Sequence, residues 1–165
     1  MPATYEPIAT TTLGTASATI NFTSIPATYT DLRVVLTCTS TSSGALRYRF
    51  NSDTATNYNY LYIYANGSSA QSAQFSTQTD IYLAGQVFTP SATIPSLYTI
   101  DVFNYASSSF KPVLHTAQMD YNGSGGVKRV ASIWRNTSAL TAINLIAGTS
   151  FAIGTTATLY GILKA

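Results

Sequence analysis

Apolar and polar residues alternate along most of this chain, in short runs separated by clusters of turn-forming residues. A period of two residues is typical of a β-strand with one buried face, because successive side chains of a strand point to opposite sides. We find no stretch with the period of an amphipathic helix. Strands are therefore predicted at residues 6–12, 16–22, 32–39, 46–51, 58–65, 73–87 with a break inside it, 97–105, 113–121, 127–135, 142–147 and 156–163.

Two Asn-Gly pairs, Asn66–Gly67 and Asn122–Gly123, lie between predicted strands. Asn-Gly readily adopts the positive φ angles of a tight hairpin. We therefore expect a β-hairpin at each pair, joining the strands on either side of it.

The number and spacing of these strands indicate two packed sheets. A single sheet of ten or so strands would leave both of its faces and its edges exposed. Thr and Ser make up about a quarter of the residues, and Thr, Tyr, Val, Ile and Phe suit a pleated surface. We predict an all-β fold, a jelly roll or β-sandwich of about eight to ten antiparallel strands, forming one domain over residues 1–165.

The alternation also assigns core faces. In the strand at 32–39 the side chains of one apolar set share a side, and in the strand at 46–51 a second set does so, with Arg47 and Arg49 turned the other way. The two predicted sets are Leu32, Val34, Leu36 and Cys38, and Leu46, Tyr48 and Phe50. Cys38 is the only cysteine, so no disulfide forms within the chain, and a small buried hydrophobe is its expected role.

Tyrosine recurs at every second position between residues 57 and 64. In a strand, Tyr58, Tyr60, Tyr62 and Tyr64 would project from one side. A tyrosine ring offers a large amphipathic surface at low conformational entropy, which suits a contact between subunits. We expect these four tyrosines to form that interface. Packing within the sandwich and stacking on a sugar ring are the alternatives.

Charged side chains are scarce, at 8% of the residues, and include six carboxylates and a single histidine, His115. Acid–base and nucleophilic catalysis require carboxylates, imidazoles or thiols gathered in one pocket. We expect a protein that is not an enzyme and that acts through its surface. A glycan depolymerase is disfavoured because no two acidic residues are placed by a recognisable motif.

The formal net charge is +2, from eight Lys and Arg that are mostly scattered. Nucleic-acid binding requires basic residues massed on one face, so no nucleic-acid partner is expected. No apolar run approaches the roughly 18 residues that span a bilayer, and the first residues lack the apolar region of a secretory signal. The sequence predicts synthesis in a cytoplasm and no membrane partner.

One loop-like stretch holds several oxygen donors, Asp53, Asn57 and Asn59, of the kind that calcium binds. Their spacing does not match a calcium-binding EF-hand loop, so we expect a solvated turn. His115 has no second His, Cys or Glu near it in sequence and is expected to be structural. Trp134 is expected to anchor the core. No metal and no cofactor are predicted.

Six segments along the chain form a recognisable series. They are YEPIATTTL at 5–13, SIPATYTDL at 24–32, LRYRFNSD at 46–53, WRNTS at 134–138, FAIG at 151–154 and TLYGI at 158–162. In this series the chain resembles a group of small virion proteins of tailed bacteriophages, often found among phages of cyanobacteria. The likeness runs over nearly the whole chain but is weak between residues 66 and 95.

The resemblance implies a jelly-roll module displayed on a phage particle, commonly as a homotrimer. Such modules serve as cement or decoration proteins over junctions of the major capsid protein, or as parts of tail fibres and tail tips. We expect a capsid cement protein that trimerises, binds the major capsid protein and stabilises the shell. Its expected location is the virion, after assembly in the cytoplasm of the host bacterium. The alternative is a tail-fibre or tail-tip module that binds a host surface glycan.

Overall fold

The computed structural model describes residues 4–84, 90–121 and 123–163. These residues form twelve β-strands, and every strand pair within the sheets is antiparallel. The predicted all-β fold is confirmed, although the strands outnumber the expected eight to ten. The part of the chain that the structure describes contains no helix long and apolar enough to cross a membrane.

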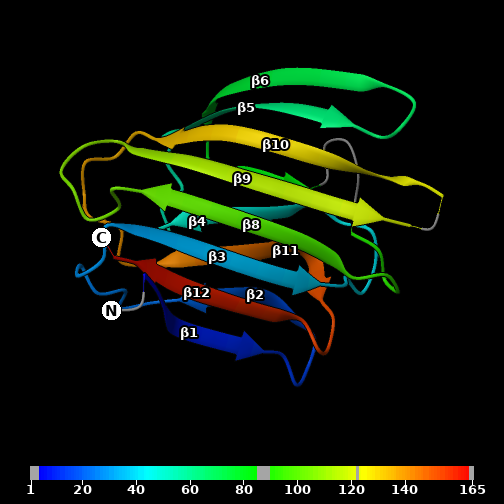
Figure 1. The fold of residues 1–165 in the computed structure, drawn as a ribbon, viewed down its shortest axis with the longest axis horizontal. Coiled ribbons are helices and arrows are strands. Elements are labelled where there is room, and N and C mark those ends of the chain that lie inside the picture. Colours follow the sequence, from blue (N-terminus) through cyan, green and yellow to red (C-terminus); the bar gives the residue numbers. More distant parts are fainter. Residues whose placement is uncertain (1–3, 85–89, 122, 164–165) are drawn as a thin grey trace.

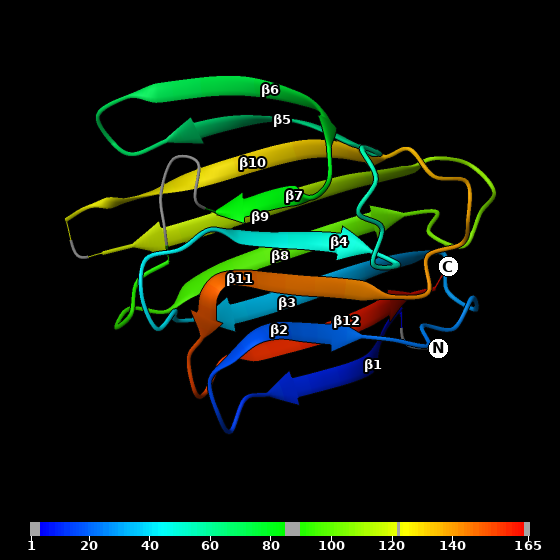
Figure 2. The same ribbon diagram turned by 180° about the vertical axis from the view of Figure 1, so that it is seen from behind.

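The strands form two sheets of unequal size. They are β1 (Tyr5–Thr12), β2 (Ser17–Phe22), β3 (Asp31–Cys38), β4 (Leu46–Phe50), β5 (Tyr58–Ala65), β6 (Ala70–Gln78), β7 (Ile81–Ala84), β8 (Ser96–Phe103), β9 (Lys111–Asp120), β10 (Gly125–Trp134), β11 (Ile143–Phe151) and β12 (Thr156–Ile162). The eight-stranded sheet has the order β1-β12-β3-β8-β9-β10-β5-β6, and the four-stranded sheet has the order β2-β11-β4-β7. Figure 1 is seen from the larger sheet and Figure 2 from the smaller one.

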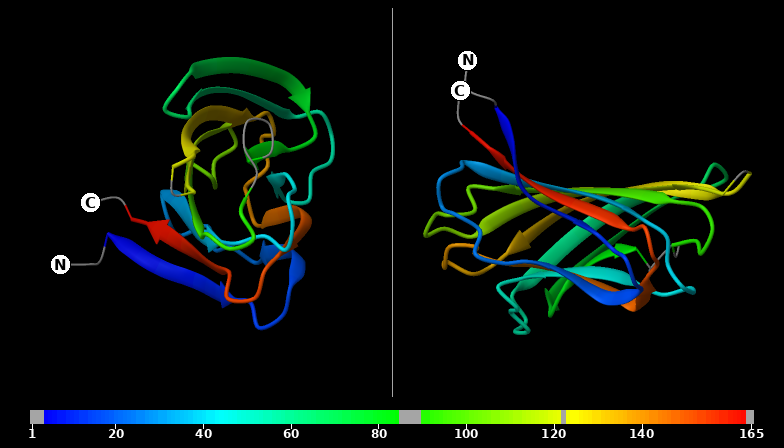
Figure 3. Two further views of the ribbon diagram at one scale, coloured as in Figure 1. Left: turned by 90° about the vertical axis from the view of Figure 1, so that its right-hand side faces the viewer. Right: turned by 90° about the horizontal axis from the view of Figure 1, so that it is seen from below.

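The chain passes repeatedly from one sheet to the other. β2, β4, β7 and β11 lie in the smaller sheet, and the strands between them lie in the larger sheet. The two layers face each other in Figure 3. A β-sandwich wrapped in this way has the pattern of a jelly roll, here with β8, β9 and β10 running as a meander through the larger sheet.

One continuous core fills the space between the sheets. Both predicted core faces are confirmed, because the alternating apolar residues of β3 and β4 are buried and Arg47 and Arg49 point away from them. Trp134 is fully buried, as expected for a core anchor. Burial raises the pKa of the Cys38 thiol to about 12, so the thiol stays protonated and unreactive at neutral pH.

The predicted strand at 73–87 divides into β6 and β7, which belong to different sheets. Residues 85–87 of that prediction lie outside the described residues. Thr77 has a φ of 55°, and the register of β6 on β5 shifts there. The chain then turns at Thr79 and Asp80 to reach the smaller sheet. The expected break is therefore the crossing between the two layers.

Asp80 stabilises this crossing through contacts with two arginines of β4. Its carboxylate is buried and accepts hydrogen bonds from Arg47 (3.4 Å) and Arg49 (3.1 Å) of β4. Arg49 also donates from Nε to the carbonyl of Thr79 at 3.1 Å. The two arginines that alternate with the core residues of β4 thus hold the start of β7 beside it.

The hairpin expected at Asn66–Gly67 joins β5 to β6. Gly67 has a φ of 86°, in the left-handed region that glycine adopts without strain. The Asn66 side-chain oxygen accepts hydrogen bonds from the backbone N–H groups of Ser68 (3.1 Å) and Ser69 (2.8 Å). The second expected hairpin, between β9 and β10, also forms, with Gly123 at a φ of 109°. Its Asn122 lies outside the described residues.

β11 continues beyond its predicted end at residue 147 and extends to Phe151. The added stretch contains Ala-Gly-Thr at 147–149, and glycine is often found at turns. In the structure the pairing of β11 with β2 shifts register between Ile146 and Phe151, so the strand contains an irregularity and then pairs again.

Candidate docking surface

The tyrosine face of β5 points into the sandwich. Tyr58, Tyr60, Tyr62 and Tyr64 are between 0 and 7% exposed within a single chain. Tyr60 stacks on Phe75 of β6 with ring centres 5.0 Å apart. These side chains do not form an exposed surface, so the expected subunit contact through them is corrected to packing within the subunit, the alternative that the sequence left open.

The opposite face of β5 is accessible instead. Leu61 is 50% exposed and Ile63 is 63% exposed, and Val127 of the neighbouring strand β10 is 56% exposed. Cross-strand register places Ile63 opposite Arg129, Ala65 opposite Val127, and Leu61 opposite Ala131. We call Leu61, Ile63, Ala65, Val127 and Ala131 the β5–β10 patch. It lies on the outer face of the larger sheet, away from the smaller sheet.

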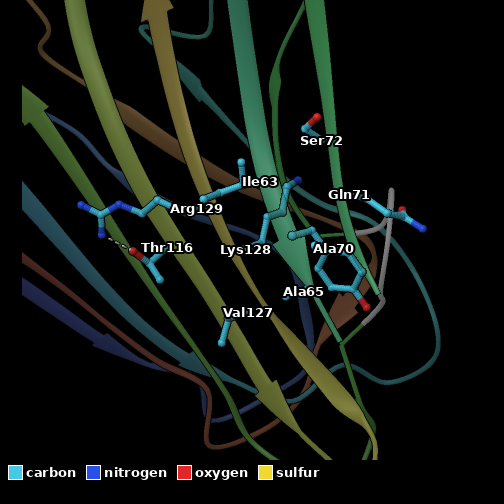
Figure 4. A pocket seen from close by; sticks show the side chains of 10 residues that line it. Ile63, Ala65, Ala70, Gln71, Ser72, Thr116, Val127, Lys128 and Arg129 are labelled. Carbon is cyan, nitrogen blue, oxygen red and sulfur yellow. Dashed lines mark hydrogen bonds between the residues drawn. The ribbon is translucent and has the colours of Figure 1, made fainter. Parts of the chain in front are cut away.

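A shallow groove of about 480 Å³ lies at one end of this patch. Figure 4 shows Ile63, Ala65 and Val127 there, with Ala70 and Ser72 contributed by β6. The Arg129 side chain extends from β10 toward β9 and donates from Nη1 to the Thr116 hydroxyl at 2.6 Å (Figure 4). This contact turns the guanidinium toward β9, so the apolar side chains of the patch stay uncovered by it.

Lys128 lies between Val127 and Arg129 but points inward and is buried. Its Nζ donates to the carbonyl of Tyr82 at 3.2 Å and lies 4.5 Å from the centre of the Tyr62 ring. Among the described residues it forms no ion pair with a carboxylate. Burial lowers its pKa to about 8. The two-residue period of the predicted strand at 127–135 already places Lys128 on the side opposite Val127 and Arg129, although a lysine is rarely fully buried.

His115 is buried between the sheets, as expected for a structural histidine. Its Nδ1 lies 3.0 Å from the hydroxyl of Tyr48, which in turn lies 3.4 Å from the hydroxyl of Ser132. Burial, followed by the positive charges of Lys128 and Arg129, lowers the pKa of His115 well below its usual value. The imidazole is therefore neutral at physiological pH and joins the two sheets through Tyr48 of β4.

Lys111 is the second buried lysine, and it has a different environment. Its Nζ donates to the backbone carbonyls of Ser107 (2.8 Å), Ser109 (2.6 Å) and Asn136 (3.3 Å). It also lies 5.7 Å from the centre of the Trp134 ring. This ammonium group links the loop before β9 to the loop after β10. Its role could not be inferred from the sequence, because its acceptors are backbone atoms.

The oxygen donors considered for calcium are occupied by internal hydrogen bonds. The Asp53 carboxylate accepts from Asn57 Nδ2 and from Trp134 Nε1, both at 2.8 Å, and the Asn59 side chain accepts from the Thr77 N–H. Burial by itself raises the pKa of Asp53, but the hydrogen bonds from Asn57 and Trp134 outweigh it and lower that pKa. Within residues 4–84, 90–121 and 123–163, no three His, Cys, Asp or Glu side chains gather as a metal site would require.

Comparison with known proteins finds no family model that matches the chain and no curated protein sequence that is similar to it.

Proposed function

We propose that this protein is a structural component of a bacteriophage particle, a cement protein that binds the major capsid protein through the β5–β10 patch. The observation that carries this proposal is the exposed apolar surface of Leu61, Ile63 and Val127 on the outer face of the larger sheet. Contiguous apolar side chains on a protein surface mark sites of interaction with another macromolecule.

The segments that carry the resemblance to phage virion proteins support this setting through the fold. LRYRFNSD forms β4 and the turn after it, and WRNTS begins at the end of β10. The two segments meet where the Trp134 indole donates to the Asp53 carboxylate. These two segments thus contribute to the body of the sandwich.

Docking would stabilise the shell by mass action. A ligand that binds only the assembled capsid shifts the equilibrium toward assembly. Complete burial of an exposed Val, Leu or Ile side chain contributes about 1.5–3 kcal/mol. Leu61, Ile63 and Val127 are 50–63% exposed, so each would contribute about half of that, which suits a weak contact repeated over many copies on a shell. The homotrimer implied by the resemblance would repeat the contact three times in each bound unit.

The experiment measures binding of the purified protein to capsids assembled from the major capsid protein of the same phage. We expect Ile63→Lys to lower the affinity at least about tenfold, because a lysine ammonium in an apolar contact must lose its hydration. Ile153→Lys is the matched control, since Ile153 is 67% exposed and lies in the turn between β11 and β12.

Far-UV circular dichroism shows whether both variants keep their β-structure. Equal binding by Ile63→Lys and Ile153→Lys would contradict docking through the β5–β10 patch. A wild-type protein that binds host cells and ignores capsids would remove the cement proposal itself.

One observation favours the alternative, a tail module that binds a host glycan. Tyr5 of the edge strand β1 and Phe103 of β8 are exposed on the same face of the larger sheet and belong to one row across β1, β12, β3 and β8. The Arg33 guanidinium lies 5.5 Å from the centre of the Tyr5 ring. Exposed aromatic rings beside polar groups suit stacking on a sugar. Loss of host-cell binding in Tyr5→Ala would support this alternative.

A further inference from the structure

β6 forms one edge of the larger sheet and pairs only with β5 (Figure 1). It is nine residues long, with the sequence AQSAQFSTQ, and contains neither a charged residue nor a proline. An edge strand presents a row of unpaired N–H and C=O groups, and another strand can pair with them. The composition of β6 includes none of the residues that usually prevent such pairing.

The register shows which backbone groups face outward. The N–H of Asn66 donates to the carbonyl of Ser69 at 3.2 Å, which makes these residues a hydrogen-bonded pair. Hydrogen-bonded and non-hydrogen-bonded pairs alternate in an antiparallel ladder. Counting from Asn66–Ser69, the non-hydrogen-bonded pairs are Ala65–Ala70, Ile63–Ser72 and Leu61–Gln74. The N–H and C=O groups of Ala70, Ser72 and Gln74 consequently point away from β5.

The free stretch ends at residue 74. The carbonyl of Ser76 accepts hydrogen bonds from the Thr77 hydroxyl (2.7 Å) and the Gln78 amide (2.8 Å), and Thr77 adopts a positive φ. Residues 70–74 thus supply six outward-facing backbone groups in regular strand geometry. This is enough for a short ladder with one further strand.

The other three sheet edges carry protective features that residues 70–74 of β6 lack. β1 carries Glu6 and Pro7 and has an irregular register between Pro7 and Ala9. On β2 the Ser17 hydroxyl donates to the carbonyl of Thr19 at 2.8 Å and accepts from the Thr19 N–H at 3.3 Å. Within the described part of the chain, β7 comprises four residues. Short strands, prolines, charges and bulges are the features that protect edges from pairing.

We propose that β6 pairs with β6 of a second copy of this chain, antiparallel and about a two-fold axis at Ser72. This register places Ala70 opposite Gln74 of the partner and Ser72 opposite its counterpart, so all six outward groups are paired reciprocally. Because β6 carries no charge, the two copies bring no like charges together across the contact.

The contact would join the two larger sheets into one continuous sheet. Ile63 lies opposite Ser72 in register, so the β5–β10 patches of both copies would face the same side, three strand spacings apart, about 14 Å. The pairing itself rests on backbone geometry and does not depend on the proposed docking to a capsid. It also produces a dimer rather than the trimer that the resemblance implies.

The mass of the full-length protein in solution tests this proposal, measured by sedimentation equilibrium over a dilution series. We expect a species of two 17.6 kDa chains for the wild type. Ser72→Pro should halve that mass, because proline removes the central outward N–H, while the ladder to β5 does not use that group. Thr19→Lys, on the edge of β2, should leave the mass unchanged, and Ser72→Lys should halve it.

A second measurement keeps the test independent of the folding of the proline variant. At a two-fold axis the Cα atoms of the two Ser72 residues would lie about 5.5 Å apart, within the range that a disulfide bridges. Ser72→Cys should therefore form a covalent dimer on mild oxidation, and Thr19→Cys should not.

A monomeric wild type, or a mass that Ser72→Pro and Ser72→Lys leave unchanged, would overturn the edge contact. A trimer that persists in both variants would do the same. Capsid binding is scored separately, so a dimer that ignores capsids supports the edge contact and contradicts the docking proposal, whereas a monomer that binds capsids does the reverse.

Discussion

Lys128 places a cation in the core of this protein without a carboxylate partner among the described residues. Its contacts with the carbonyl of Tyr82 and the ring of Tyr62 replace only part of the hydration that the ammonium loses on folding. The pKa of about 8 is the consequence, since burial favours the neutral amine. The same strand exposes Val127 and Arg129, so the strand periodicity alone directs this lysine inward.

Lys128 should make the free energy of unfolding depend on pH. The folded pKa of Lys128 lies below the unfolded value of 10.5, so the unfolded chain binds more protons between these values and the free energy of unfolding rises with pH. From about pH 7.5 to 9.5 the rise should be about 2 kcal/mol. Urea unfolding measures it, and Lys128→Met should remove this part of the slope.

Lys128→Met should also be the more stable protein at pH 7.5, because it removes the desolvation of a buried charge and keeps the volume of the side chain. All other titratable groups are common to both proteins, so comparison of the two curves isolates the lysine. Parallel curves for the wild type and Lys128→Met would show that Lys128 is hydrated in the native state.

At the scale of elements, hydrogen bonds made by polar side chains decide where strands end and how loops are placed. Asp80 directs the crossing from β6 to β7 through Arg47 and Arg49, and Asn66 shapes the turn between β5 and β6. Lys111 does the same for two loops at one end of the sandwich. The Asn66 contacts are local in sequence, whereas the contacts of Asp80 with Arg47 and Arg49, and of Lys111 with Asn136, join distant segments that only the folded chain brings together.

Lys111→Met should destabilise the protein, in contrast to Lys128→Met. Three loop carbonyls would lose their donor at once, and a buried acceptor left without a partner costs about 1–3 kcal/mol. The expected result is a lower urea midpoint at pH 7.5 and faster hydrogen exchange in residues 107–109. A midpoint equal to that of the wild type would mean that water replaces the ammonium on these carbonyls.

The whole molecule is a sandwich with one continuous core, and its two sheets contact each other through residues such as Tyr48, Phe50 and Trp134. Tyr48 of the smaller sheet meets His115 of the larger one, so the layers share a hydrogen bond as well as apolar contacts. A shared core gives the sheets no separate stability.

Thermal or urea unfolding should therefore be one cooperative transition. Trp134 is the only tryptophan and is fully buried between the sheets, so its fluorescence reports the core. We expect the fluorescence curve and the far-UV circular dichroism curve to coincide. A fluorescence transition that precedes the loss of β-structure would indicate sheets that separate before they unfold.

The sequence by itself determined the class of fold and most strands, because a two-residue period is a local property of the chain. It also determined the buried sets on β3 and β4, where one side of each strand is clearly more apolar. It could not determine which side of β5 faces the core, since tyrosines occupy one side and Leu61 and Ile63 the other.

Only the tertiary structure decided that question, because the answer depends on what lies beneath the strand. Phe75 and Lys128 pack against the tyrosines inside the sandwich, and the apolar residues Leu61 and Ile63 are left facing solvent. The division of residues 73–87 between two sheets, and the position of β6 at a free edge, likewise follow from pairing between distant strands. Such pairing depends on the whole fold and produces no periodic pattern in the sequence.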